Sequence, residues 1–208
     1  MDTALMAQFW LVALLLALTP GADWAYAISA GLRARSVVPS VAGMASGYAL
    51  VVTIVAVGAG AVVTAYPVTL TALTVIGSAY LLYLGVSTLT AKVEPITASD
   101  QPLGTGPLSQ FFRGAGISGI NPKGLLLLLA LLPQFTSASG AWSSTAQMFT
   151  LGSLHVANCA VIYLGVALLA KQLLKSRPRA SNAVVKVSGV LMVLIGTSIL
   201  VEQGASLF

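Results

Sequence analysis

Charge is the scarcest property of this sequence. Only 7% of its 208 residues are charged, whereas 57% are hydrophobic, and the mean hydropathy is +0.94. A soluble domain carries about 25% charged residues, so this chain has too few polar groups to cover a surface that faces water. We therefore expect an integral membrane protein, packed as a single domain over residues 1–208.

Cysteine, histidine and acidic residues are also rare. The one cysteine, Cys159, lies in an apolar run, which excludes an internal disulfide. The one histidine, His155, and the one mid-span acidic residue, Asp23, are scattered. A metal-ion exporter would need clustered ligands, so it is kept only as an alternative, and we expect no bound metal or cofactor. The net charge of +5 comes from basic residues in short loops without interleaved aromatics, so nucleic acid is not an expected partner.

Long apolar segments fill most of the chain. A membrane-crossing helix needs about 20 predominantly apolar residues. Six segments meet this requirement, at approximately 5–30, 41–63, 67–90, 114–135, 145–169 and 183–202. The first imitates a signal peptide, but the only charge before it is Asp2, whereas a signal peptide begins with basic residues. We therefore expect it to be retained as the first span.

A polar stretch divides these six spans into two halves. Residues 92–112 are rich in Pro, Gly, Ser and Thr, and predict a linker between three helices in 1–91 and three in 113–208. Nine of the ten Lys and Arg lie in or beside the first, third and fifth loops. Basic loops face the cytoplasm, so we expect both termini outside. Three helices per half then give two halves of opposite orientation, the inverted repeats of many secondary transporters.

The first and fourth spans each contain a proline near the middle, beside a charge. The first reads ALTPGADWAY over residues 17–26, and the fourth reads GINPKGLLLL over 119–128. Thr19-Pro20 and Asn121-Pro122 both have the pattern of a helix N-cap followed by proline at the first helical position. This pattern predicts that each span stops and a new half-helix starts in the middle of the membrane.

A helix break at this depth offers ligand-binding groups. The new N-terminus presents free N–H groups and a positive dipole end, which bind a carboxylate. Each proline also releases an upstream carbonyl, at Leu16 and at Ser118, which could accept a hydrogen bond from an ammonium group. Such backbone is tolerated only where it is buried in protein or lines a wet cavity. The alternative is that both prolines merely kink structural helices.

Asp23 and Lys123 bring opposite charges to the same depth. Each lies ten residues from a basic residue at the cytoplasmic end of its span, Arg33 and Arg113 respectively. At about 1.5 Å per residue, both are roughly 15 Å from the cytoplasmic face. A lone charge there costs several kcal/mol, so we expect the two to pair, directly or through water or substrate, and to be the coupling residues. The alternative is a purely structural ion pair.

Other residues in the spans have two interpretations each. His155 and Asn158 are three apart and share a helix face, either as a hydrogen-bonded interior pair or as lining of a substrate cavity. Gly43 and Gly47 permit a close helix contact, within or between subunits. Three tyrosines could offer rings or hydroxyls to a substrate, or could only pack. They are Tyr26, Tyr80 and Tyr83.

Four motifs together resemble the LysE/RhtB family of amino-acid exporters. They are LTPGAD (18–23), GSAYLLYLG (77–85), NPKG (121–124) and LLPQF (131–135), and their order and spacing match over essentially the whole chain. The resemblance implies a six-helix bacterial inner-membrane carrier that exports an amino acid or close derivative, with proton antiport as its driving force. The residues to which it points are Thr19, Pro20, Gly21, Asp23, Asn121, Pro122 and Lys123. We add Gly124 from the second break, together with His155 and Asn158.

An intramembrane serine protease is the alternative from a different class. Residues 116–119 read GISG, the GxSG nucleophile pattern of rhomboid proteases, and Ser118 with His155 could form an activated nucleophile. A motif this short arises easily by chance, and His155 lies in the fifth span where rhomboid proteases use the sixth. We therefore expect no enzyme. We expect an all-α carrier of six transmembrane helices, built as two inverted three-helix repeats, that transports a zwitterionic amino acid.

Overall fold

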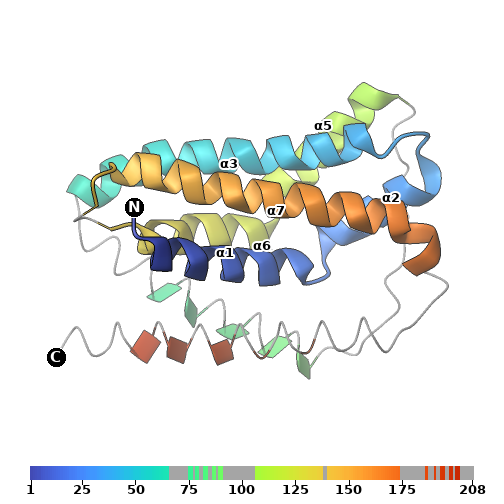
Figure 1. Ribbon diagram of the computed structural model, residues 1–208. Helices are drawn as coiled ribbons and strands as arrows, with labels where there is room; N and C mark the ends of the chain where they lie inside the picture. Colours follow the sequence, from blue (N-terminus) through green and yellow to red (C-terminus); the bar gives the residue numbers. More distant parts are fainter. Residues whose placement is uncertain are drawn as a thin grey trace.

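The computed structural model describes residues 1–65, 106–137 and 140–173, with scattered positions between 75 and 90 and between 186 and 201 (Figure 1). Every regular element among these residues is a helix, as predicted. The expected third and sixth spans fall largely outside the described residues, as do Tyr80 and the linker up to residue 105. The division into two inverted repeats therefore stays a prediction.

The described helices correspond to the predicted first, second, fourth and fifth spans. In chain order they are α1 (Thr3–Leu18), α2 (Ala22–Arg33), α3 (Val38–Ala65), α5 (Pro107–Gly119), α6 (Pro122–Leu126), the π-helix η1 (Leu127–Leu131), the 3-10 helix η2 (Leu132–Phe135) and α7 (Ser144–Leu173). The α3 and α7 helices are long and apolar enough to cross a membrane as single helices. The pairs α1 with α2, and α5 with the helices that follow it, reach that length as broken spans.

The first and fourth spans are interrupted where the sequence predicts. Each is bent by 58°, the first between Leu18 and Ala22 and the fourth between Gly119 and Lys123. The fourth span is longer than expected, because α5 begins at Pro107, inside the segment that was assigned to the linker. Proline suits this first helical position, since it has no N–H group that would need a partner in the helix.

The two breaks differ in their capping, and the prediction for Thr19 is wrong. Asn121 is an N-cap, and its side-chain oxygen accepts a hydrogen bond from the backbone N–H of Lys123 at 3.1 Å. Thr19 instead ends α1, because its hydroxyl donates back to the carbonyl of Leu15 at 2.9 Å, as threonine often does within a helix. The residue that caps α2 is Gly21, which supplies no side-chain hydrogen bond.

Glycines let the helix backbones touch. A Cβ on Gly43 of α3 would lie 2.0 Å from the carbonyl oxygen of Phe111, and one on Gly114 of α5 would lie 2.4 Å from that of Ser40. Gly47 is equally close to α5. The contact expected of Gly43 and Gly47 is therefore made within the chain. The α7 helix contacts α1, α2 and α3, so it packs in the middle of the described bundle (Figure 1).

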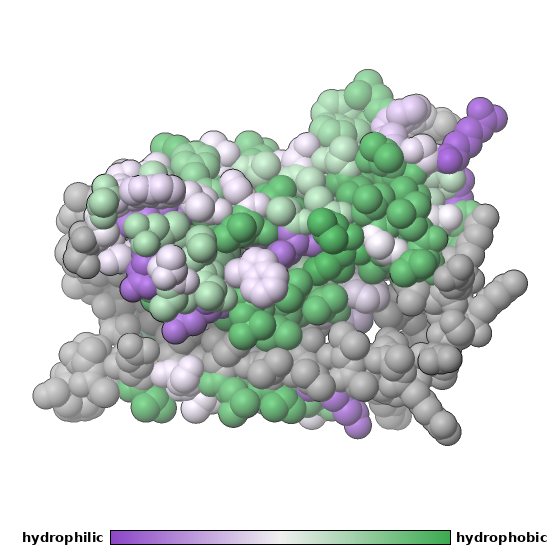
Figure 2. Space-filling view, viewed as in Figure 1, coloured by the Kyte–Doolittle hydropathy of each residue, from purple (hydrophilic) through white to green (hydrophobic). Residues whose placement is uncertain are grey.

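Hydrophobic side chains also cover much of the outside. Leu50 and Ile54 on α3 are both 61% exposed, and Val161 on α7 is 71% exposed. Figure 2 shows such side chains gathered in a broad area over the described helices. An outer surface of this kind suits contact with lipid and leaves the polar groups for the interior.

Candidate functional site

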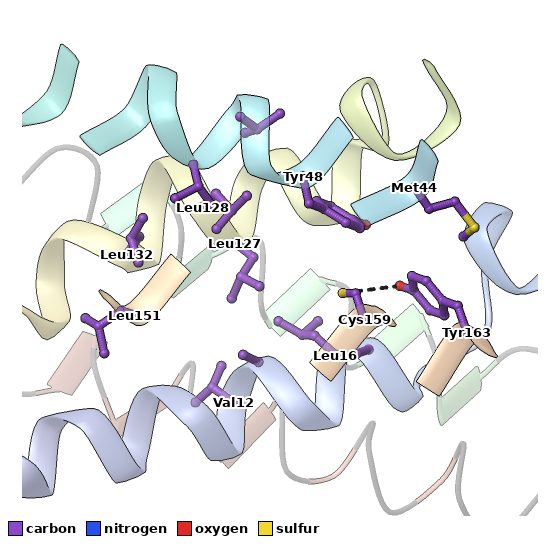
Figure 3. Packing of buried hydrophobic residues seen from close by; sticks show 14 of the residues in the cluster. Val12, Leu16, Met44, Tyr48, Leu127, Leu128, Leu132, Leu151, Cys159 and Tyr163 are labelled. Atoms are coloured by element: carbon purple, nitrogen blue, oxygen red, sulfur yellow. Dashed lines mark hydrogen bonds between the residues drawn. The ribbon is translucent and has the colours of Figure 1, made fainter. Parts of the chain in front are cut away.

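Most of the described interior is apolar, and the largest connected group of buried polar side chains lies near the two breaks. Leu128, Leu132 and Leu151 fill one part of the core, whereas Tyr48 and Tyr163 point toward the interior from α3 and α7 in another part (Figure 3). The two ring hydroxyls meet the side chains of the broken spans there. Each of these polar groups is therefore tied to the place where a helix is interrupted.

The carboxylate of Asp23 is the centre of this polar region. Asp23 lies in the first turn of α2 and is only 1% exposed. Its Oδ2 accepts hydrogen bonds from the hydroxyl of Tyr48 at 2.6 Å, the amide of Asn121 at 2.6 Å and the hydroxyl of Tyr163 at 3.0 Å. Its Oδ1 accepts from the hydroxyl of Ser118 at 2.8 Å. The carboxylate therefore joins α2 to α3, α5, α7 and the second break.

Neutral donors make this burial tolerable. A buried carboxylate without partners would carry a large desolvation cost, which charge-assisted hydrogen bonds offset. The position of Asp23 in the first turn of α2 adds the favourable end of the helix dipole. Asp23 and Lys123 form no direct ion pair in the described part of the chain. The expected pair could therefore act only through an intermediary.

The ammonium of Lys123 lies at the first break. It donates to the carbonyl of Leu16 at 2.9 Å and to the carbonyl of Thr19 at 2.7 Å, both at the C-terminal end of α1. The carbonyl of Leu16 also accepts from the backbone N–H of Thr19 at 3.2 Å. The ammonium group that it binds in this structure therefore belongs to the chain itself, and binding of a cargo ammonium there stays a prediction. The corresponding carbonyl of Ser118 accepts instead from the backbone N–H of Asn121 at 3.3 Å.

The N-terminus of α2 is open beside this ammonium. Gly21 and Ala22 are exposed, and Gly21 gives the helix no side-chain cap. A Cβ on Gly21 would lie 3.7 Å from the Nζ of Lys123. A positive helix end and a cation therefore lie side by side, an arrangement that attracts an anion. Pro20 lies between the two helices, and the indole of Trp24 closes the break by donating to the carbonyl of Ala17 at 2.9 Å.

His155 extends the polar region along α7. It is 2% exposed, its ring lies edge-on to Tyr48 with centroids 5.0 Å apart, and its Nε2 is 3.5 Å from the sulfur of Cys159. That sulfur is 3.8 Å from the hydroxyl of Tyr163 (Figure 3). His155, Cys159 and Tyr163 are each four residues apart, so they share one face of the helix.

Asn158 lies apart from this region. Its Oδ1 accepts from the indole of Trp10 at 3.1 Å, and its buried Nδ2 has no hydrogen-bond partner among the described residues. Of the two interpretations of His155 and Asn158, the hydrogen-bonded interior pair is therefore not formed, and the lining of a substrate cavity stays a prediction. The two residues belong to different surroundings, although they share a helix face.

The arrangement of Ser118 and His155 does not support the protease alternative. The hydroxyl of Ser118 donates to Asp23, and the described residues show no hydrogen bond between Ser118 and His155. A serine nucleophile needs such a base within reach. For the metal-ion alternative, no three His, Cys, Asp or Glu side chains gather among the described residues.

Two site residues escaped the sequence analysis. Tyr48 and Tyr163 lie in apolar spans without any motif, and only the spacing of Tyr163 from His155 could have suggested Tyr163 as a site residue.

Three residues named in the sequence analysis have other surroundings. Gly124 has a steric role, since its position is in contact with the ring of Tyr48. Tyr26 donates to the carbonyl of Gln110 at 2.7 Å and so ties α2 to α5, while Tyr83 is 68% exposed.

Comparison with known proteins agrees with the resemblance in the motifs. The LysE type translocator family matches residues 14–203. The chain is 30% identical to an uncharacterized membrane protein of Vibrio cholerae, covering 83% of this chain and 84% of the relative. It is 28% identical to the homoserine/homoserine lactone efflux protein of Salmonella typhimurium, covering 90% and 92% respectively. No solved structure matches the chain significantly. With nearly its whole length matched, this chain belongs to the LysE type translocator family.

Proposed function

We propose that the protein is a secondary carrier that exports an amino acid or a close derivative from the cytoplasm by proton antiport. Its family is one of translocators, and the Salmonella typhimurium relative is named for homoserine and homoserine lactone efflux. Both support a small cargo of the amino-acid type. The broken spans support a carrier mechanism, because transporter sites are commonly built from discontinuous helices.

The observation that carries this proposal is the meeting of opposite helix ends at the first break. The C-terminal end of α1 presents carbonyls, and the N-terminal end of α2 is uncapped beside Lys123. A zwitterion has one group for each end. Its carboxylate is attracted by the α2 terminus together with the Lys123 ammonium, and its amine by Asp23 or by the carbonyls of α1. The α6 terminus is less open, because Asn121 caps it.

Asp23 is the proposed proton-coupling group. It is a buried carboxyl group whose hydrogen-bond partners come from both halves of the sequence. Three of those partners, Ser118, Tyr48 and Tyr163, are hydroxyls, which can either donate or accept. The network can therefore hold the carboxyl group charged or protonated, and protonation would weaken the contacts that join α2 to the other helices. The inverted repeats and the outward-facing termini remain part of the proposal.

The test is export of a panel of labelled amino acids from cells that express the protein, with vector-only cells as the control. We expect at least one amino acid to leave faster from the expressing cells, and this advantage to shrink when the proton gradient is collapsed. Rates equal to the vector-only rates for the whole panel, with the protein present in the membrane, would refute the proposed function.

A further inference from the structure

We propose that the carbonyls of Leu16 and Thr19 form the binding site for the primary ammonium group of the cargo, and that Lys123 occupies this site while the carrier is empty. The identity of the cargo rests on the function proposed above. The existence of a site for a primary ammonium does not, because the structure already shows such a group bound there.

The site is built from two backbone carbonyls that converge on one nitrogen. They lie 2.9 and 2.7 Å from the Nζ of Lys123, and the residues that carry them are each 3% exposed. The carbonyl of Leu16 also accepts from the backbone N–H of Thr19 at 3.2 Å, so the ammonium takes its second acceptor position. The neighbouring carbonyls of Leu15 and Ala17 accept from Thr19 and Trp24 respectively. The negative end of the α1 dipole adds to the attraction for a cation.

Asp23 does not compete for the cargo amine in this conformation. Each carboxylate oxygen offers about two acceptor positions. The Oδ2 of Asp23 already receives three hydrogen bonds, and its Oδ1 receives one, from Ser118. The side chain is only 1% exposed, so protein atoms close the approach to the remaining position on Oδ1. A cargo amine would have to displace a tyrosine, serine or asparagine from it. At the carbonyls of α1 the amine replaces only another ammonium, so the number and kind of hydrogen bonds are kept.

Lys123 can leave the two carbonyls and still remain close to the first break. Its ammonium is held on a flexible four-carbon stem, and the side chain is only partly buried. The position of a Cβ on Gly21, at the open end of α2, is 3.7 Å from its nitrogen. A displaced Lys123 therefore stays beside the α2 terminus, where it meets the carboxylate of the same cargo. The exchange requires a cargo with its own ammonium group and keeps the carbonyls paired when no cargo is present.

The experiment separates the ammonium from its stem. Lys123→Ala removes the last three carbons and the nitrogen, so n-propylammonium can refill the space. Lys123→Met keeps the length of the stem and leaves only the Nζ position vacant, which the ammonium ion can fill. Lys186→Ala, at an exposed position elsewhere, is the matched control. The readout is the Tm of purified protein in detergent as each probe is titrated, with 1-propanol as the uncharged counterpart of n-propylammonium.

A ligand that binds the folded state raises the Tm in a saturable way. We expect n-propylammonium to raise the Tm of Lys123→Ala, and the ammonium ion to raise that of Lys123→Met. Neither should raise the Tm of the wild type or of Lys186→Ala, and 1-propanol should have no such effect on Lys123→Ala. Absence of rescue in both variants, or failure of both to fold with or without the amines, would show a fixed structural cap and overturn the proposal.

The cargo is tested in the same Lys123→Ala protein. An amino acid that the wild type exports should compete with n-propylammonium, because both need the same two carbonyls. Independent binding of the two would overturn the assignment of this site to the cargo. If no amino acid is exported but n-propylammonium still rescues Lys123→Ala, the ammonium site stands and the proposed function fails, so the two failures are distinguishable.

Discussion

Gly124→Ala tests how Asp23 is held, through a residue that makes no hydrogen bond to it. The added Cβ would lie 2.2 Å from Cε1 of Tyr48 and 2.7 Å from its hydroxyl oxygen, whereas ordinary contact begins near 3.4 Å. The ring of Tyr48 must therefore move by about an ångström. It is not free to do so, because its hydroxyl is bound to Asp23 at 2.6 Å and its ring packs on His155.

The expected cost follows from these contacts. Overpacking a buried position costs about 1–3 kcal/mol. A hydrogen bond of 2.6 Å that is stretched by about an ångström is no longer a hydrogen bond, and losing one to a charged group costs about 1.5–3 kcal/mol more. For a chain of this size each kcal/mol lowers the Tm by about 2–4 °C. We therefore expect Gly124→Ala to lower the Tm by about 10 °C and to reduce export.

Gly116→Ala is the matched control, since a Cβ at Gly116 meets nothing within 4 Å. It should leave the Tm and export close to those of the wild type. Tyr48→Ala removes the ring that the new Cβ would meet. In the Tyr48→Ala protein, Gly124→Ala should therefore lower the Tm much less than it does in the wild type. A Gly124→Ala protein with the Tm and export of the wild type would refute the position assigned to Tyr48.

Four further outcomes are expected. Asp23→Asn keeps the shape of the side chain but cannot titrate, so exchange of internal for external cargo should continue while gradient-driven net export stops; retained gradient-driven export would place the coupling group elsewhere. Pro122→Leu should fold and reach the membrane but export poorly, and full export would show that the second break is only tolerated. Gly43→Ala sets a Cβ 2.0 Å from a backbone oxygen, so it should lower stability by about 3 kcal/mol, seen as a lower Tm; an unchanged Tm would contradict the close α3–α5 contact. In intact cells, a membrane-impermeant thiol reagent should label Ala141→Cys and not Ser36→Cys, and the reverse pattern would overturn the predicted orientation.

The interruptions could be predicted from the sequence because proline breaks the backbone hydrogen bonding locally. Pro122 begins a helix after Asn121, as expected, because the amide side chain of asparagine reaches the free N–H of Lys123. Thr19 has the same kind of position in the sequence, but its hydroxyl bonds to the carbonyl four residues before it. Both residues are followed by proline, so the pattern of residue types that predicted the breaks does not distinguish between these two local hydrogen bonds.

The partners of Asp23 and Lys123 could be predicted only in part. The equal depth of the two charges predicted their proximity to each other's span, and Lys123 does reach α1. It binds carbonyls rather than the Asp23 carboxylate, whose Oδ2 already accepts from Tyr48 on α3 and from Tyr163 on α7. Tyr48 is 25 positions from Asp23 in the sequence, and Tyr163 is 140 positions from it. Contacts over such separations depend on helix packing, so no local motif predicts them.

The central claim is that the first break binds both charged groups of a zwitterion, the carboxylate and the ammonium. The most direct measurement is counterflow into proteoliposomes that contain the purified protein and are preloaded with the exported amino acid. Three external substrates are compared: the labelled free amino acid, its N-acetyl derivative and its methyl ester. The account predicts rapid uptake of the free amino acid, no carrier-dependent uptake of the N-acetyl derivative and slower uptake of the ester. Equal uptake of the N-acetyl derivative and the free amino acid would contradict it.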